Sequence, residues 1–229
     1  MRQYTSRRAE KCLTQNVKKQ FEELQSLLER AMALQTSMVL FEWDDETLAP
    51  KGAAEHTARV IGSLSEQYQE ILASMRFKEL LDVCQKAEKE NAGVFDEVQS
   101  AILREAAEEQ ERLSCIPPEE YRAYAELTAR ATGIWTRARE KNDFASFAPV
   151  LKEIISYQKK FAAYRAKPGQ KLYDVMLDTY EKGFNMEMLD PFFELMKGKI
   201  VPLLKESAER SKRVPDAFLS ADYPEAAQA

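Results

Sequence analysis

Apolar residues recur along most of this chain at the three- and four-residue spacing of an α-helix. No stretch shows the every-second-residue alternation of a half-buried strand, and the 229 residues include only seven Gly and nine Pro to interrupt helices. The sequence therefore predicts an all-α fold, an array of long antiparallel helices. The first helix illustrates the pattern, with its apolar stripe at Val17, Phe21, Leu24, Leu28, Ala31 and Met38.

Capping residues and helix breakers give the expected boundaries. Thr14 or Asn16 caps the first helix, and Pro117-Pro118-Glu119-Glu120 starts the fifth, because proline and acidic residues suit a first helical turn. Because Pro191 lacks the N–H that a helix interior needs, the last helix begins at either Met186 or Asp190. The helices are expected at about 17–47, 53–72, 77–90, 95–113, 118–141, 144–166, 173–180 and 186–205.

No linker divides the predicted helices, so residues 15–229 are expected to form one helical unit. Residues 1–14 are expected to be a disordered or additional N-terminal extension. Within the helix at 95–113 one side is acidic and predicted to face solvent, at Glu105, Glu108, Glu109 and Glu111. The side predicted to point inward carries Phe95, Val98, Ile102, Ala106 and Leu113.

Charge and cysteine usage exclude several classes of protein. The net charge of -5 argues against a nucleic-acid partner, which would require a basic surface. No apolar run approaches the ~20 residues of a membrane span, and no secretory signal follows the basic start. The three cysteines lack C-x-x-C spacing, which favours inert thiols over a metal site. We therefore expect a cytoplasmic protein with no nucleic-acid or membrane partner.

His56 is the only histidine, which limits the chemistry available to the chain. An H-E-x-x-H zinc site needs two histidines one helical turn apart. We therefore expect no metal ligands, no catalytic residues and no cofactor in this chain, with His56 exposed or half-buried on the second helix. Paired acids such as Asp44-Asp45-Glu46 have the groups for acid–base catalysis, but such pairs usually form a solvated helix surface. The residues alone predict a soluble helical domain without a catalytic constellation.

Residues 41–59 resemble a segment near the start of the carboxypeptidase Taq family of metallocarboxypeptidases. Its W-D-x-x-T-x-x-P pattern and following glycine match Trp43, Asp44, Thr47, Pro50 and Gly52, and Arg59 is the nearest candidate for a family arginine. Three later stretches resemble the family in the same order. These are Trp135 to Leu151 (W-x-x-A-x-x-x-x-D-F-x-x-F-x-P-x-L), Tyr173 to Gly183 (Y-D-x-L-L-D-x-Y-E-P-G, with Lys182 replacing the proline), and Ile200 to Leu203 (I-x-P-L).

The resemblance implies a fragment of a zinc- or cobalt-dependent enzyme that removes single residues from peptide C-termini and usually forms homodimers. The family's H-E-x-x-H helix, third glutamate ligand, H-P-F and D-x-R-x-T segments come later than the matched segments, and none is present here. The fold implied is the N-terminal portion of a helical metallocarboxypeptidase, and the chain alone is expected to be inactive. The alternative is a helical interaction or dimerisation module without enzymatic activity.

The resemblance leaves two interpretations of the segment around Trp43. In the first, Trp43, Asp44, Thr47 and Arg59 form part of the wall of the family's peptide groove. In the second, Trp43 packs against the end of the first helix and Asp44 helps to turn the chain toward Pro50. For Trp135 a position in the core is the favoured interpretation.

Overall fold

The computed structural model describes the backbone of residues 2–50, 52–91, 93–211, 215, 217–221 and 224, and their side chains from residue 15 onward except that of Phe218. Helices account for nearly all of these residues, and no strand occurs within them, which confirms the all-α prediction. The elements are α1 (Arg2–Thr47), α2 (Ala54–Ala73), α3 (Met75–Glu90), α4 (Glu97–Ser114), α5 (Pro118–Glu140), α6 (Phe144–Arg165), α7 (Leu172–Tyr180), α8 (Met186–Ser211) and the 3₁₀ helix η1 (Ala217–Ser220).

Most boundaries agree with the sequence-based ones to within one or two residues, but the start of α1 does not, and α8 ends at Ser211 rather than near Lys205. The helix begins at Arg2, well before the caps predicted at Thr14 or Asn16. The division at residue 15 stays a prediction. Helix α4 begins at Glu97 because Asp96 and Gln99 form a reciprocal capping box. Helix α8 begins at Met186 and contains both prolines that the sequence placed inside it.

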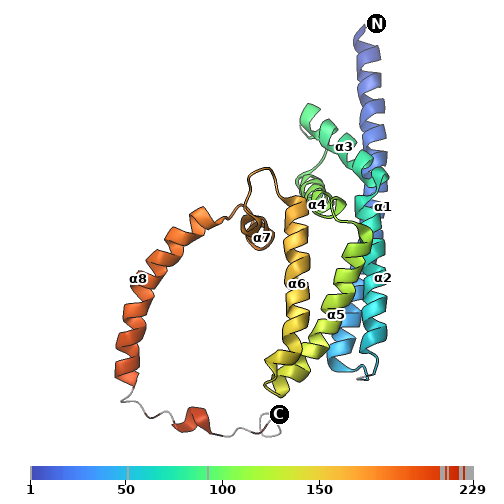
Figure 1. Ribbon diagram of the computed structural model, residues 1–229. Helices are drawn as coiled ribbons and strands as arrows, with labels where there is room; N and C mark the ends of the chain where they lie inside the picture. Colours follow the sequence, from blue (N-terminus) through green and yellow to red (C-terminus); the bar gives the residue numbers. More distant parts are fainter. Residues whose placement is uncertain are drawn as a thin grey trace. The chain divides into compact units, whose positions relative to one another are not determined.

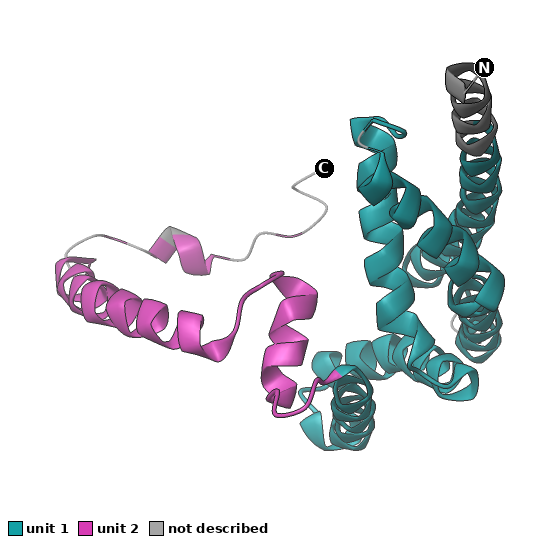
Figure 2. Cartoon of the chain, turned by 90° about the horizontal axis from the view of Figure 1, so that it is seen from above, with its two compact units in different colours: residues 1–165 teal, residues 166–229 magenta. Residues whose placement is uncertain are grey.

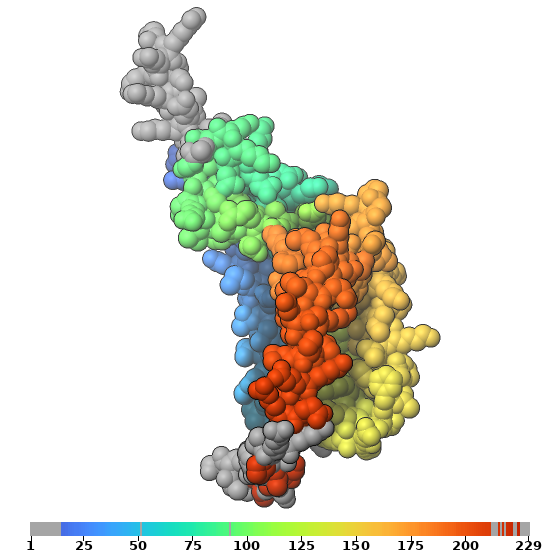
Figure 3. Space-filling model, turned by 90° about the vertical axis from the view of Figure 1, so that its left-hand side faces the viewer, coloured from blue at the N-terminus to red at the C-terminus, as the bar shows by residue number. Residues whose placement is uncertain are grey.

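The chain divides into two compact units, residues 1–165 and 166–229, at a position where the sequence showed no linker. Figure 2 distinguishes the two units by colour. In the first unit, α1, α2, α5 and α6 run alternately up and down beside one another (Figure 1). Helices α3 and α4 lie side by side at one end of this unit (Figure 3). The antiparallel array that the sequence predicted is confirmed.

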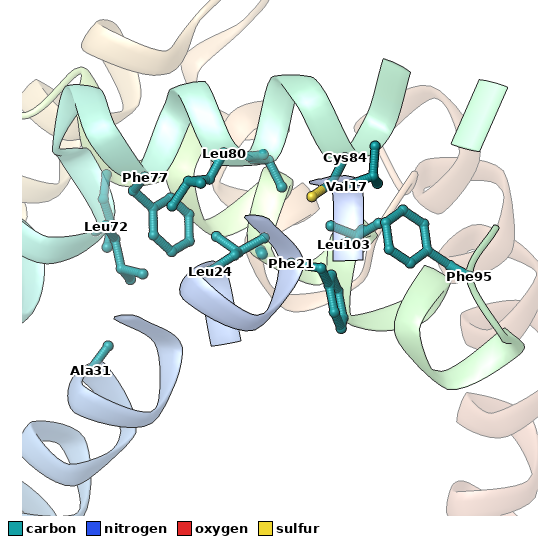
Figure 4. Close-up of a cluster of buried hydrophobic side chains, with 13 residues drawn as sticks. Val17, Phe21, Leu24, Ala31, Leu72, Phe77, Leu80, Cys84, Phe95 and Leu103 are labelled. Atoms are coloured by element: carbon teal, nitrogen blue, oxygen red, sulfur yellow. The ribbon is translucent and has the colours of Figure 1, made fainter. Parts of the chain in front are cut away.

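The main core lies where α3 and α4 meet α1 and the end of α2. Figure 4 shows Phe77 and Leu80 of α3 directed toward Leu24 of α1. The rings of Phe21 and Phe95 lie 4.9 Å apart between centroids, which joins α1 to the segment before α4. Cys84 is buried among these apolar residues, and burial raises the pKa of its thiol to about 11.

The inward face of α4 differs from the predicted one. Ala106 and Leu113 are buried as expected, but Val98 is 69% exposed and Leu103 is fully buried in its place. The predicted solvated acidic side is also interrupted. Glu109 is half-buried and accepts a hydrogen bond from the Tyr68 hydroxyl of α2 at 3.1 Å.

Helix α2 is the centre of the first unit and binds the connection between α4 and α5 through a buried amide. Gln69 Nε2 donates to the carbonyl oxygens of Leu113 at 3.1 Å and Ile116 at 2.6 Å. Leu113 lies in the last turn of α4 and Ile116 in the connection that follows it. Helix α5 then returns along α2 and packs on α6, where the rings of Tyr124 and Phe161 lie 5.3 Å apart.

The second unit is organised by two aspartates of α7. Asp174 Oδ1 accepts the backbone N–H of Met186 at 2.8 Å and so fixes the first turn of α8. Asp178 Oδ1 accepts the backbone N–H of Gly183 at 2.8 Å. Gly183 has a φ of +81°, a conformation that a side chain would disfavour. Among the described helices of both units, none combines the length and apolar character needed to cross a membrane.

Candidate functional site

The segment that resembles the carboxypeptidase motif forms the turn between α1 and α2. The backbone N–H groups of Leu48 and Ala49 both donate to the carbonyl oxygen of Asp44, at 2.9 and 2.8 Å, which ends α1. The N–H of Ala53 then donates to the carbonyl oxygen of Pro50 at 2.8 Å. The chain therefore reverses within a few residues and begins α2 beside α1.

A pocket of about 280 Å³ lies next to this turn, between α1, α2 and α5. One wall is acidic, because Glu42, Asp45 and Glu46 of α1 all line it. The remaining walls are threonines and small apolar residues of α2 and α5. These are Ala54, Thr57, Ala58, Ile61, Thr128, Ala129 and Thr132.

Of the predicted groove-wall residues, those on α1 lie on a different side of the helix from the pocket. At 100° per residue, Trp43, Asp44 and Thr47 point away from the side that carries Glu42, Asp45 and Glu46. All three are exposed, and Trp43 retains 57% of its accessible surface. Thr47 Oγ1 donates to the carbonyl oxygen of Trp43 at 2.6 Å. Arg59 is exposed on α2, so the pocket brings none of the four together.

The second interpretation of the segment around Trp43 agrees with the structure only in part, because Trp43 is exposed and is not packed against the end of α1. The turn toward Pro50 uses the backbone carbonyl of Asp44, as the second interpretation required in part. The core position predicted for Trp135 is wrong, because the side chain is 43% exposed. The Arg139 guanidinium lies 5.3 Å from the centroid of the Trp135 ring, which is a cation–π arrangement.

Ion pairs connect α5 to α2 beside the pocket. Arg122 Nη1 lies 3.0 Å from Glu66 of α2 and its Nε lies 3.0 Å from Glu126. These hydrogen bonds, first to Glu126 and then to Glu66, raise the pKa of the Arg122 guanidinium. Arg130 Nη1 lies 3.6 Å from Glu55 and 3.8 Å from Glu126. Glu126 therefore lies between two arginines that each reach α2.

The pocket does not fit a metal ion. Over the described part of the chain, no group of three His, Cys, Asp or Glu residues is placed to hold one. His56 is exposed on α2, as the sequence predicted. The zinc or cobalt that the family resemblance implies thus finds no ligand set in this part of the chain.

Sequence reasoning interpreted Asp45 and Glu46 as a solvated helix surface and missed the other residues that line the pocket. A signal for its acidic wall was present, because Glu42, Asp45 and Glu46 have the i, i+3, i+4 spacing of one helix side. No comparable signal marked Thr57 or Thr128. Their position depends on α2 and α5 lying together, although some 70 residues separate them in sequence.

The fold is a helical array with an acidic pocket, and among its described residues no group of three or more His, Cys, Asp or Glu is placed to hold a metal ion. Residues 23–229 match the family model described as carboxypeptidase Taq (M32) metallopeptidase. The chain belongs to this family. The resemblance first seen at Trp43, Asp44 and Thr47 is thereby confirmed.

Known relatives give the extent of the match. Carboxypeptidase 1 of Bacillus subtilis is 32% identical over 206 residues, which cover 90% of this chain and 40% of that protein. Thermostable carboxypeptidase 1 of Pyrococcus furiosus is 31% identical over 183 residues, 80% of this chain and 36% of that protein. The chain thus spans about two fifths of the length of the curated relatives that it matches.

Solved structures agree on the fold. The crystal structure of BsuCP superposes with a TM-score of 0.84 at 31% identity, over 90% of this chain and 41% of that one. The Trypanosoma cruzi metallocarboxypeptidase 1 superposes with a TM-score of 0.68 at 26% identity, over 90% of this chain and 40% of that one. The similarity is therefore to one part of each of these longer chains.

Proposed function

We propose that this chain is the N-terminal helical scaffold of a metal-dependent carboxypeptidase, whose metal ligands lie in a part of the protein that this chain does not contain. The observation that carries the proposal is the combination of a family match over residues 23–229 with coverage of only 40% of the Bacillus subtilis relative. The single histidine supports it, since a catalytic zinc site generally uses three protein ligands.

In the complete protein, a bound zinc or cobalt ion would supply Lewis-acid chemistry for removing single residues from peptide C-termini. The role of this chain is to support that centre and to shape access to it. Trp43, Asp44, Thr47 and Arg59 are proposed to face the peptide groove. Their exposure supports this role, because none of them is used to pack the helices of this chain.

The first test uses the 229-residue chain alone. After dialysis, metal analysis should find less than stoichiometric zinc, and a carboxypeptidase assay should detect no release of C-terminal residues. One tightly held zinc ion per chain, or sustained turnover that a metal chelator abolishes, would contradict the proposal.

The second test supplies the missing part. A chimera would join this chain to the portion of Bacillus subtilis carboxypeptidase 1 that lies outside the 206-residue match. Loaded with zinc or cobalt, it should release the C-terminal residue of an N-blocked peptide, and the chelated form serves as the control. A folded, metal-loaded chimera without turnover would count against a scaffold role.

A second candidate function, self-association as a helical module, is favoured by one observation on α1. Met32, Val39, Leu40 and Trp43 are all more than half exposed and recur at helical spacing along one side. A homodimer through this side would cover them. Light scattering of the chain alone distinguishes the two ideas, because the module requires a dimer and the scaffold does not.

A further inference from the structure

The pocket beside the turn between α1 and α2 is formed within the first unit. Its lining residues come from α1, α2 and α5, which lie beside one another in that unit (Figure 1). None of them comes from the described part of residues 166–229. The volume of about 280 Å³ is suited to a small organic molecule.

The acidic wall of this pocket carries three carboxylates that remain unpaired. Within the described residues, Glu42, Asp45 and Glu46 take part in no ion pair. Arg130, which lies next to the lining of α5, is already paired with two other carboxylates. Like charges four residues apart on one helix side repel each other, so a dissolved cation is attracted by all three groups.

A buried hydroxyl gives an independent indication of a ligand. Thr57 lines the pocket with only 8% of its surface exposed, and its hydroxyl forms no hydrogen bond within the described part of the chain. Thr128 of α5, by contrast, donates its hydroxyl to the carbonyl oxygen of Tyr124 at 3.1 Å, as threonines in helices commonly do. A buried hydroxyl without a partner is unfavourable, so Thr57 is available to a polar group held in the pocket.

The arrangement favours an extended organic dication over a metal ion. The carboxylates line the pocket without converging, since no three His, Cys, Asp or Glu residues of the described chain are placed to hold a metal. Glu42 and Glu46 are four residues apart, which is about 6 Å along the helix axis. Two ammonium groups joined by four methylene groups span about the same distance. Ala54, Ala58 and Ile61 offer an apolar surface to the methylene groups.

We propose that this pocket binds a short aliphatic diamine of the 1,4-diaminobutane type. The two ammonium groups pair with the carboxylates of Glu42, Asp45 and Glu46, and the hydroxyl oxygen of Thr57 accepts a hydrogen bond from one of them. A lysine side chain presents the same ammonium chemistry with only one charge, which leaves part of the acidic wall unpaired. The inference goes beyond the proposed function, because neither a metal nor peptide cleavage takes part in it.

Titration calorimetry of the 229-residue chain with 1,4-diaminobutane tests the proposal. We expect one diamine per chain with a Kd of about 1 mM or lower, since charge-assisted hydrogen bonds form at both ends of the ligand. The monoamine 1-aminobutane and the amide of Nα-acetyl-lysine should both bind at least about ten-fold more weakly. Absence of saturable diamine binding, or equal affinity for the diamine and the monoamines, overturns the proposal.

A magnesium control separates the site from a diffuse attraction of cations to an acidic surface. At equal concentration, Mg²⁺ should leave most of the diamine bound, because the carboxylates do not converge on a point charge. Complete displacement of the diamine by Mg²⁺ at that concentration contradicts a built diamine site.

Substitutions locate the site on the pocket. Glu42→Gln and Glu46→Gln each remove one charge at nearly constant shape and should raise the Kd about ten-fold. Glu29→Gln is the matched control, because Glu29 is exposed on the same helix and lies outside the pocket lining. The control should bind the diamine like the wild-type protein. Equal Kd values for all three variants reject the pocket as the site.

Thr57→Val tests the role of the buried hydroxyl. Because no hydrogen bond within the described residues is lost, the melting temperature should be retained or raised, while the Kd for the diamine rises about five-fold. A variant that loses stability and binds the diamine normally would show that the hydroxyl serves the fold, and it would remove Thr57 from the site.

Discussion

The backbone of Gly62 on α2 lies directly against the side chain of Glu126 on α5. A Cβ atom at Gly62 would lie 2.3 Å from Cγ and 2.8 Å from Oε1 of Glu126. Glu126 is itself paired with Arg122 at 3.0 Å and Arg130 at 3.8 Å. Gly62 therefore leaves the space that the side chain of Glu126 occupies between α2 and α5.

Gly62→Ala should destabilise the protein, although alanine is the better helix former. The new methyl group displaces Glu126 and disturbs its two ion pairs, and we expect a loss of about 1–3 kcal/mol, typical of overpacking. Chemical denaturation measures the change. The matched control is Gly133→Ala on α5, where the nearest atom is Arg137 Nη1 at 3.5 Å. It should stabilise by about 0.5–1 kcal/mol. Unchanged stability in Gly62→Ala would show that Glu126 moves without cost.

The variants Leu103→Ala and Val98→Ala test whether Leu103, as in the structure, or Val98, as predicted from the sequence, lies on the buried side of α4. Leu103 is fully buried, so its truncation should cost about 2–5 kcal/mol, whereas Val98 is 69% exposed and its truncation should change stability by less than about 0.5 kcal/mol. Thermal unfolding of both variants checks this. Similar losses in the two would favour the sequence-based placement of Val98 in the core.

Alkaline stability should depend on Tyr68. Burial, and then the nearby Glu109 carboxylate, raise the pKa of Tyr68 above its ordinary value of 10.0. The folded protein therefore keeps a proton that the unfolded chain loses. This stabilisation is complete below pH 10 and is lost as pH rises above it, by at most about 1.4 kcal/mol per pH unit.

Tyr68→Phe tests this dependence. The variant should lose about 1 kcal/mol near pH 8, because the hydrogen bond to Glu109 is gone, and its stability should fall less steeply above pH 10. Tyr180→Phe is the control, since Tyr180 is 79% exposed. Parallel pH profiles for the wild-type protein and Tyr68→Phe would contradict the assignment.

Local patterns accounted for most of the helices. Pro118 starts α5 as predicted, whereas Ser74 and Asp96, which cap α3 and α4 through their own side chains, were not among the predicted caps. These signals act over a few residues and are therefore visible in the chain itself. The start of α1 at Arg2 was missed because a capping residue such as Thr14 is also compatible with a helix interior when the helix continues through it.

The candidate site was less accessible to sequence reasoning. The motif at Trp43 and Asp44 located the turn, and the single histidine limited the metal chemistry, but neither showed that Glu42, Asp45 and Glu46 line a pocket. The reason is geometric. A helix pattern gives the angle of each side chain around its own axis, and it does not give the neighbour that the side chain meets.

The sequence by itself determined that this protein is helical, where most of its helices lie, and to which family it belongs, because helical periodicity, caps and motifs are written in neighbouring residues. Only the tertiary structure decided that Leu103 rather than Val98 is buried, that Trp135 is exposed, and that α2 and α5 approach at Gly62. Those outcomes depend on contacts between segments distant in sequence, where packing selects one of several similarly apolar helix sides.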